Sequence, residues 1–68
     1  MSKLEELKKA LPDHTVRVRK DMTLHGEDGT EAEVTTKDAV LTVFVANKTA
    51  VSDEHFARIV ASYARRIE

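Results

Sequence analysis

The chain has 68 residues, of which 41% are hydrophobic and 34% charged, and it contains no cysteine. This composition is typical of a folded globular chain, and it excludes both a disulfide framework and a zinc site built from thiolates. The formal net charge of −1 excludes a strong overall attraction to polyanions. At this length we expect a single small domain over residues 1–68, with marginal stability.

The first predicted element is a short helix over residues 3–10. Ser2 and Glu5 have the spacing of a capping box, in which each side chain binds a backbone N–H group at the start of a helix. The leucines that follow recur at spacings of three and four, which places them on one helical face. Pro12 ends the helix, because it has no N–H group to donate and disfavours a helical residue before it.

From residue 15 the apolar residues recur at every second position, which is typical of a strand. Lys20 breaks this alternation, so we expect a bulge or a bend near Lys20 and Asp21. The alternation resumes at Ala32 and Val34. A strand, a loop and a second strand are therefore predicted between residues 15 and 35.

The loop between these strands is predicted to contain three residues, Glu27–Gly29. Such a loop would place Leu24 opposite Ala32 and, two positions further on, Met22 opposite Val34, so that apolar residues share one face. Gly29 would then occupy the position that needs a positive φ.

The same hairpin contains His25, Glu31 and Glu33, which raises the possibility of a metal site. Transition-metal sites need two or three converging histidines or cysteines, and calcium loops need carboxylates at fixed spacing. Neither pattern is present. We therefore expect no metal, no cofactor and no acid–base pair here, because the tip of a hairpin offers no pocket for a substrate.

The third strand is predicted over residues 39–46, AVLTVFVA, which carries apolar residues on both faces. A two-residue loop at Lys37 and Asp38 would pair Val34 with Leu41 and so continue the apolar face. Residues 47–49 are predicted to form a turn. The apolar run is too short to span a membrane, and the charged first residues do not resemble a signal peptide, so a cytoplasmic location is expected.

The last element is predicted to be a helix over residues 53–67. Ser52 is a favourable N-cap, and Asp53 lies in the first turn, where the helix dipole favours negative charge. Val51 and Phe56 have the spacing of a hydrophobic staple. The predicted fold is α+β, with the order α-β-β-β-α, a three-stranded antiparallel sheet and both helices packed on one face. The predicted core comprises Leu4, Leu7, Val16, Val18, Met22, Leu24, Val34, Leu41, Val43, Val45, Phe56, Ile59, Val60, Tyr63 and Ile67.

The strand over residues 39–46 suggests an interface. In a simple meander it is an edge strand, and monomeric proteins usually protect such an edge with charges, proline or a bulge. We expect the residues of its outer face to form a protein interface: Val40, Thr42, Phe44 and Ala46. The simplest partner is a second copy that pairs antiparallel about a two-fold axis, and the alternative is that the strand lies in the middle of the sheet.

Basic residues suggest an alternative function, nucleic-acid binding. The candidate contacts lie in the first helix and the first strand: Lys8, Lys9, Arg17, Arg19 and Lys20. The order of elements also resembles that of double-stranded RNA-binding domains. That family uses lysines at the start of its second helix to bind phosphate, whereas residues 52–55 here read Ser-Asp-Glu-His, so the resemblance is limited to topology.

No nucleophile motif accompanies His14 or His55, and no glycine-rich phosphate loop is present, so an enzyme is not expected. The sequence favours a non-enzymatic protein–protein interaction module, a small regulator or inhibitor that self-associates through residues 39–46. A designed scaffold is a third alternative, because caps, turns and hydrophobic pattern agree so well.

Overall fold

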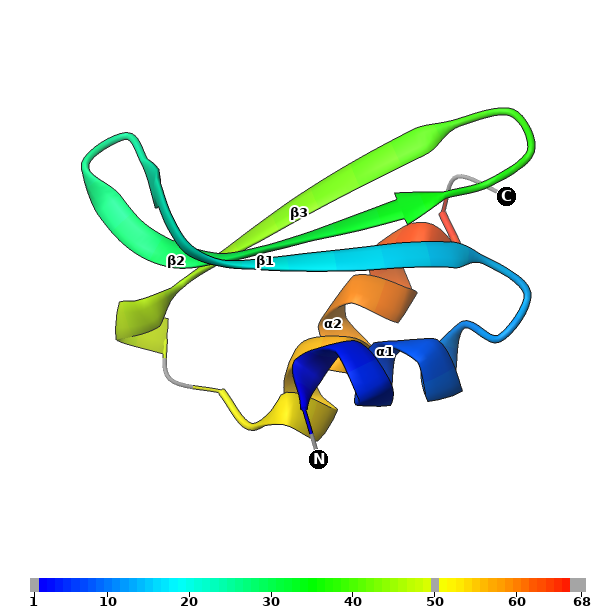
Figure 1. Ribbon diagram of the computed structural model, residues 1–68, viewed down its shortest axis with the longest axis horizontal. Helices are drawn as coiled ribbons and strands as arrows, with labels where there is room; N and C mark the ends of the chain where they lie inside the picture. The colour runs from blue at the N-terminus through cyan, green and yellow to red at the C-terminus, as the bar shows by residue number, and fades with distance from the viewer. Residues whose placement is uncertain (1, 50, 67–68) are drawn as a thin grey trace.

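The computed structural model describes residues 2–49 and 51–66. The elements follow in the order α1 (Lys3–Ala10), β1 (Thr15–Leu24), β2 (Glu27–Thr35), β3 (Val40–Ala46), the 3₁₀ turn η1 (Asn47–Thr49) and α2 (Asp53–Ala64). The three strands form an antiparallel meander in the order β1-β2-β3. Both helices lie on the same face of this sheet (Figure 1), which confirms the predicted α+β architecture.

Serine caps begin both helices, as predicted. The Ser2 hydroxyl accepts a hydrogen bond from the backbone N–H of Glu5, and the Ser52 hydroxyl accepts one from His55, each at 3.1 Å. The predicted end of α2 at residue 67 lies outside the described residues. The described helix ends at Ala64, and residues 65–66 form a turn.

The connection between β1 and β2 differs from the sequence prediction. The loop contains two residues, His25 and Gly26, with φ values of 52° and 79°. Two positive φ values define the type I′ turn that suits the twist of a hairpin. Leu24 therefore pairs with Glu27, and the predicted three-residue loop at Glu27–Gly29 is wrong, as is the positive φ predicted for the glycine that ends it.

A bulge reconciles this turn with the apolar pattern. The ladder shifts between Arg19 and Met22, where Lys20 and Asp21 of β1 lie opposite Thr30 alone. Asp21 adopts a φ of 59°, a conformation that aspartate tolerates better than most residues. The extra residue reverses which face the even-numbered side chains of β1 occupy. The bulge expected near this position is thus confirmed.

The predicted partners of the first hairpin are wrong for the same reason, since Ala32 does not pair with Leu24 and Val34 does not pair with Met22. The observed pairs are Val16 with Val34, Val18 with Ala32, and Met22 with Gly29. The second hairpin is as predicted. Its pairs include Val34 with Leu41 and Ala32 with Val43, and the backbone N–H of Thr36 donates to the carbonyl of Ala39 at 2.8 Å.

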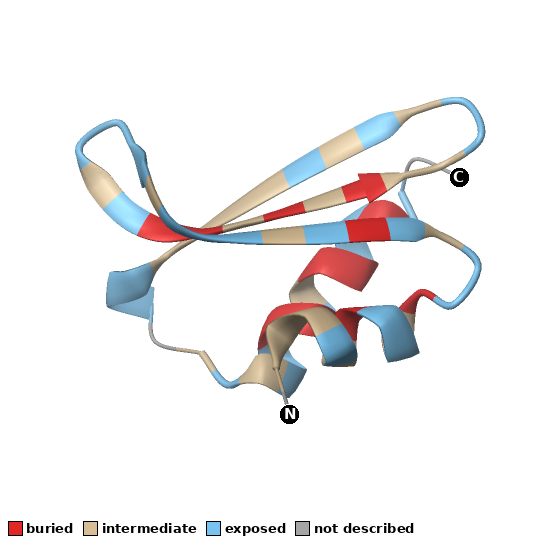
Figure 2. Cartoon of the chain, viewed as in Figure 1, coloured by how far each residue is buried: buried red, intermediate tan, exposed pale blue. Residues whose placement is uncertain are grey.

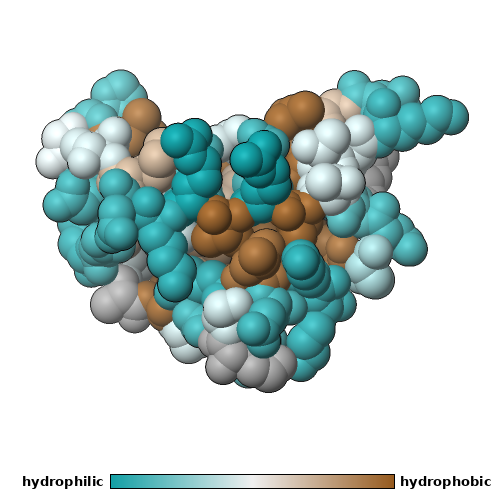
Figure 3. Space-filling model, viewed as in Figure 1, coloured by the Kyte–Doolittle hydropathy of each residue, from teal (hydrophilic) through white to brown (hydrophobic). Residues whose placement is uncertain are grey.

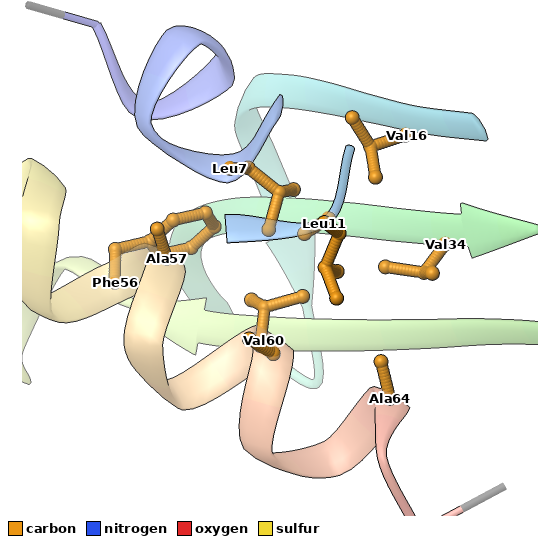
Figure 4. Packing of buried hydrophobic residues seen from close by; sticks show 10 residues of the cluster. Leu7, Leu11, Val16, Val34, Phe56, Ala57, Val60 and Ala64 are labelled. Atoms are coloured by element: carbon orange, nitrogen blue, oxygen red, sulfur yellow. The ribbon is translucent and has the colours of Figure 1, made fainter. Parts of the chain in front are cut away.

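The core lies between the sheet and the two helices (Figures 2 and 4). The buried hydrophobic residues are Leu7, Leu11, Val16, Ala32, Val34, Phe56, Ala57, Val60, Ala61 and Ala64. Partly buried residues pack around them: Leu4, Ala10, Val18, Leu41, Val43, Val45 and Val51. Figure 4 shows Val60 and Ala64 of α2 on the same side of the sheet as Val16 and Val34.

Some predicted core residues lie elsewhere. Leu24 and Tyr63 are each 44% exposed. Met22 and Ile59 are half-buried and lie outside the core cluster. Leu24 and Met22 are displaced by the bulge, which turns them to the face without helices. Ile67 lies outside the described residues.

Ile59 and Tyr63 of α2 lie outside the core because the helix is rotated about its axis relative to the prediction. Alanines face the core instead, namely Ala57, Ala61 and Ala64. Small side chains allow α2 to approach α1 closely, and the two helices contact each other along this face. The larger Ile59 and Tyr63 are therefore turned toward β3.

Candidate protein-interaction surface

β3 is an edge strand, and the ladders formed by the described residues leave one of its sides unpaired. Because Thr36 donates to the carbonyl of Ala39, Ala39 directs its backbone groups toward β2. In an antiparallel ladder, alternate residues point toward the same neighbour. Every second residue after Ala39 therefore also faces β2. The remaining residues direct their N–H and C=O groups to the free edge, and these are Val40, Thr42, Phe44 and Ala46.

The same four residues place their side chains on the face of the sheet that has no helices, because their neighbours Leu41 and Val43 pack toward the core. Val40 is 63% exposed, and Thr42 is also exposed. Phe44 and Ala46 are half-buried. The residues that the sequence singled out as an interface thus share both a face and an unpaired backbone edge.

Phe44 is partly covered by its own sheet. Gly29 is buried, and a Cβ atom at this position would lie 2.5 Å from Cζ of Phe44 and 2.5 Å from the carbonyl oxygen of Val45. The ring therefore lies over the glycine, where any other residue would collide with it. The aromatic side chain contributes to the folded protomer, and Val40 and Thr42 remain the accessible part of this face.

A groove of about 690 Å³ runs between β3 and α2. One wall is formed by β3, from Leu41 to Ala46, and the other by Ile59 and Tyr63 of α2. This groove was not predicted from the sequence, because both α2 residues were expected in the core. The alanines at positions 57, 61 and 64 were the available indication that a different face of α2 packs inward.

An ion pair lines part of the groove. Lys48 of η1 contacts the carboxylate of Glu27 at the start of β2, and both residues line the groove. Lys48 is largely exposed, with 73% of its side chain accessible. Exposed pairs of this kind contribute little to stability, so both charges remain available to a partner.

The opposite edge of the sheet has a different character. β1 carries charged, exposed residues, including Arg17, Arg19 and Lys20, and its ladder is interrupted by the bulge. Charges and bulges are the features that prevent a strand from pairing with another chain. β3 has neither, since no charged residue occurs between Val40 and Ala46.

The candidate nucleic-acid contacts do not share one surface. Arg17 and Arg19 lie on the face of the sheet without helices, where their register partners are Glu33 and Glu31. Lys8 and Lys9 are exposed in α1, on the other side of the sheet, and Lys9 lies 3.9 Å from the carboxylate of Glu6. The fold thus separates these basic residues and sets acidic residues beside them.

The apolar surface between the layers is incompletely covered. Figure 3 shows apolar residues gathered between the sheet and the helices, with hydrophilic side chains around them.

Within residues 2–49 and 51–66, no group of three histidine, aspartate or glutamate residues could hold a metal ion. In the same part of the chain, no helix is long and apolar enough to cross a bilayer.

Comparison of the chain with protein-family models, with curated proteins and with solved structures gave no match.

Proposed function

We propose that this protein is a non-enzymatic protein–protein interaction module that self-associates through the free edge of β3. The observation that carries the proposal is the contrast between the two edges of one sheet. β1 is charged and bulged, whereas β3 is uncharged and regular and has an apolar groove beside it. An edge with these properties is a template for the addition of another strand.

A second copy is the partner that the composition of β3 favours. Two copies of an uncharged strand can lie antiparallel without bringing like charges together. The contact would be isologous, which is the commonest symmetry of protein dimers. In a cell, such a protein would act as a small regulator or inhibitor that occupies the surface of another protein. A cytoplasmic location remains a prediction from the sequence.

Two substitutions of Thr42 test the proposal. Thr42→Pro removes an N–H group that points to the free edge and leaves the ladder with β2 unchanged. Thr42→Val is the matched control, because it keeps the N–H group and the branched shape. Sedimentation equilibrium should show a dimer for the wild-type protein and for Thr42→Val, and a monomer for Thr42→Pro.

Circular dichroism must show that Thr42→Pro is folded. Should the proline unfold the protein, the double variant Val40→Lys/Thr42→Lys provides the same test, because it places charges on exposed positions without altering the backbone. A wild-type protein that stays monomeric at the highest attainable concentration would overturn the proposed self-association. Dimers that persist in both the proline and the lysine variants would overturn the assignment to β3.

A further inference from the structure

The proposed function leaves open how the second copy is aligned, and the inference drawn here rests on it. We infer that the two copies pair in a single register, in which Val43 of one copy lies opposite Val43 of the other on the two-fold axis. In this register Asp38 of one copy meets Lys48 of the partner copy.

The backbone supports this register. The groups that point to the free edge belong to Val40, Thr42, Phe44 and Ala46. With Val43 on the axis, Val40 pairs with Ala46 of the second copy and Thr42 pairs with Phe44. All four residues then find partners in both copies. Centring the pairing on Thr42 or on Phe44 would leave a residue at one end of the strand without a partner.

The side chains agree with the same alignment. Side chains of paired residues lie on the same face of a sheet. On the face with the helices, Leu41 meets Val45 of the second copy, and the two copies of Val43 meet each other. The sheet then becomes continuous, and the helices of both copies lie on one side of it.

The charges at the ends of the strand are complementary. Lys48 follows Ala46 at the end of β3, and it lines the groove together with its partner Glu27. The antiparallel copy brings its own turn, with Lys37 and Asp38, to this end. In this register Asp38 of one copy lies opposite Lys48 of the other. By symmetry, the contact occurs at both ends of the interface.

The groove also contributes to the contact. A stable interface buries about 800 Å² on each partner. The protomer exposes 4659 Å² in total, so a substantial part of its surface must take part. The edge of one short strand supplies only part of this area. In the proposed register both grooves open toward the two-fold axis, so that Ile59 and Tyr63 of the two copies extend the apolar contact beneath the paired strands.

Charge reversal at the end of the strand tests the register. Asp38 is exposed in a turn, so Asp38→Lys should leave the protomer folded. It should raise the dissociation constant of the dimer roughly five- to tenfold, because two symmetry-related contacts become repulsive. Adding Lys48→Glu in the same chain should restore most of the lost affinity. Asp13→Lys, the same charge change in the exposed turn after α1, should have little effect.

The outcomes separate this inference from the proposed function. A dimer that loses affinity equally in Asp38→Lys and Asp13→Lys, or that gains nothing from the added Lys48→Glu, would overturn the register and leave self-association through β3 intact. A monomeric wild-type protein would overturn both. Loss in Asp38→Lys alone, with recovery in the double variant, would support the register.

Discussion

Gly29 illustrates how a single residue can be required by packing and not by backbone conformation. Its φ is not positive, and its position is fixed instead by the ring of Phe44 and the carbonyl group of Val45. The missing side chain allows the aromatic ring to cover the sheet. The ring of Phe44, a residue of the proposed interface, is thereby held in place within the protomer.

We predict that Gly29→Ala destabilises the protein by about 1–3 kcal/mol, because the new methyl group overlaps a backbone oxygen and the ring of Phe44. Denaturant titration measures this free energy. Gly26→Ala is the comparison, since its Cβ would meet nothing within 4 Å and would add only the conformational cost of a positive φ. Adding Phe44→Leu should relieve part of the first defect and none of the second. Equal losses of stability in Gly29→Ala and Gly26→Ala, with no relief from Phe44→Leu, would contradict the packing role of Gly29.

Asp53 joins the first turn of α2 to the start of α1. It accepts a hydrogen bond from Nζ of Lys3 at 2.9 Å, and Lys3 also lies 5.8 Å from the centre of the Phe56 ring. The hydrogen bond from Lys3 lowers the pKa of Asp53 below its ordinary value of 3.8. A lowered pKa in the folded state means that the ionised carboxylate favours folding.

The contribution of this pair to stability should therefore depend on pH. It is present above pH 3.8, where the carboxyl group of the unfolded chain is ionised, and it is lost as the pH falls through the lower pKa of the folded protein. Wild type should be more stable than Asp53→Asn near neutrality, and the difference should disappear in strong acid. A carboxyl titration followed by NMR should show the pKa of Asp53 rising toward 3.8 in Lys3→Met. An unchanged titration would show that Lys3 is not the cause.

The elements show what the sequence could and could not predict. Caps, helix starts and the second hairpin follow from local rules, and all were predicted correctly, because each depends on residues that are close in sequence. The first hairpin was assigned wrongly. Register rules assume an unbroken alternation, and a bulge at Lys20 and Asp21 together with a type I′ turn at His25 and Gly26 satisfies the same apolar pattern differently.

The orientation of α2 shows a second limit. Its sequence contains two apolar stripes, one of large residues and one of alanines, and periodicity alone favours the larger. The position of α1 decides between them, because close approach of two helices requires small side chains. For the candidate site, the edge residues of β3 could be predicted from strand order. The groove could not, because it depends on which face of α2 packs against α1.

We predict that Ala61→Leu destabilises the protein by about 1–3 kcal/mol, because Ala61 is 3% exposed and lies beside α1. Ser62→Leu adds the same side chain at the adjacent, exposed position and should change stability little. The free energy of unfolding of both variants can be measured by denaturant titration. If the two substitutions had similar costs, the alanine stripe would not be the contact between the helices.

At the scale of the whole molecule, the arrangement is asymmetric. The α1 side of the sheet ends in a charged, bulged strand, and the α2 side ends in an apolar strand with an open groove. A small domain gains little stability from its own core. Burying the β3 edge and its groove against another copy would therefore add to the stability of the fold. Self-association and folding would then be coupled through the same surface.

This coupling makes stability depend on concentration. If the dimer is the folded form that is favoured, the midpoint of thermal unfolding should rise as the protein concentration rises. The rise should vanish in Thr42→Pro, whose edge cannot pair. A midpoint that is independent of concentration in the wild-type protein would contradict the coupling.

In the proposed dimer, β3 pairs with β3 of a second copy around Val43. Because the chain has no cysteine, a single Val43→Cys substitution tests this pairing directly. Facing residues at a non-hydrogen-bonded position lie about 4.5 Å apart at their Cα atoms, within the range for a disulfide. Val18→Cys on β1, also partly buried against the core, is the matched control. Under mild oxidation, non-reducing electrophoresis should show a covalent dimer for Val43→Cys and monomer for Val18→Cys, whereas equal cross-linking of the two variants, or none in either, would contradict this pairing.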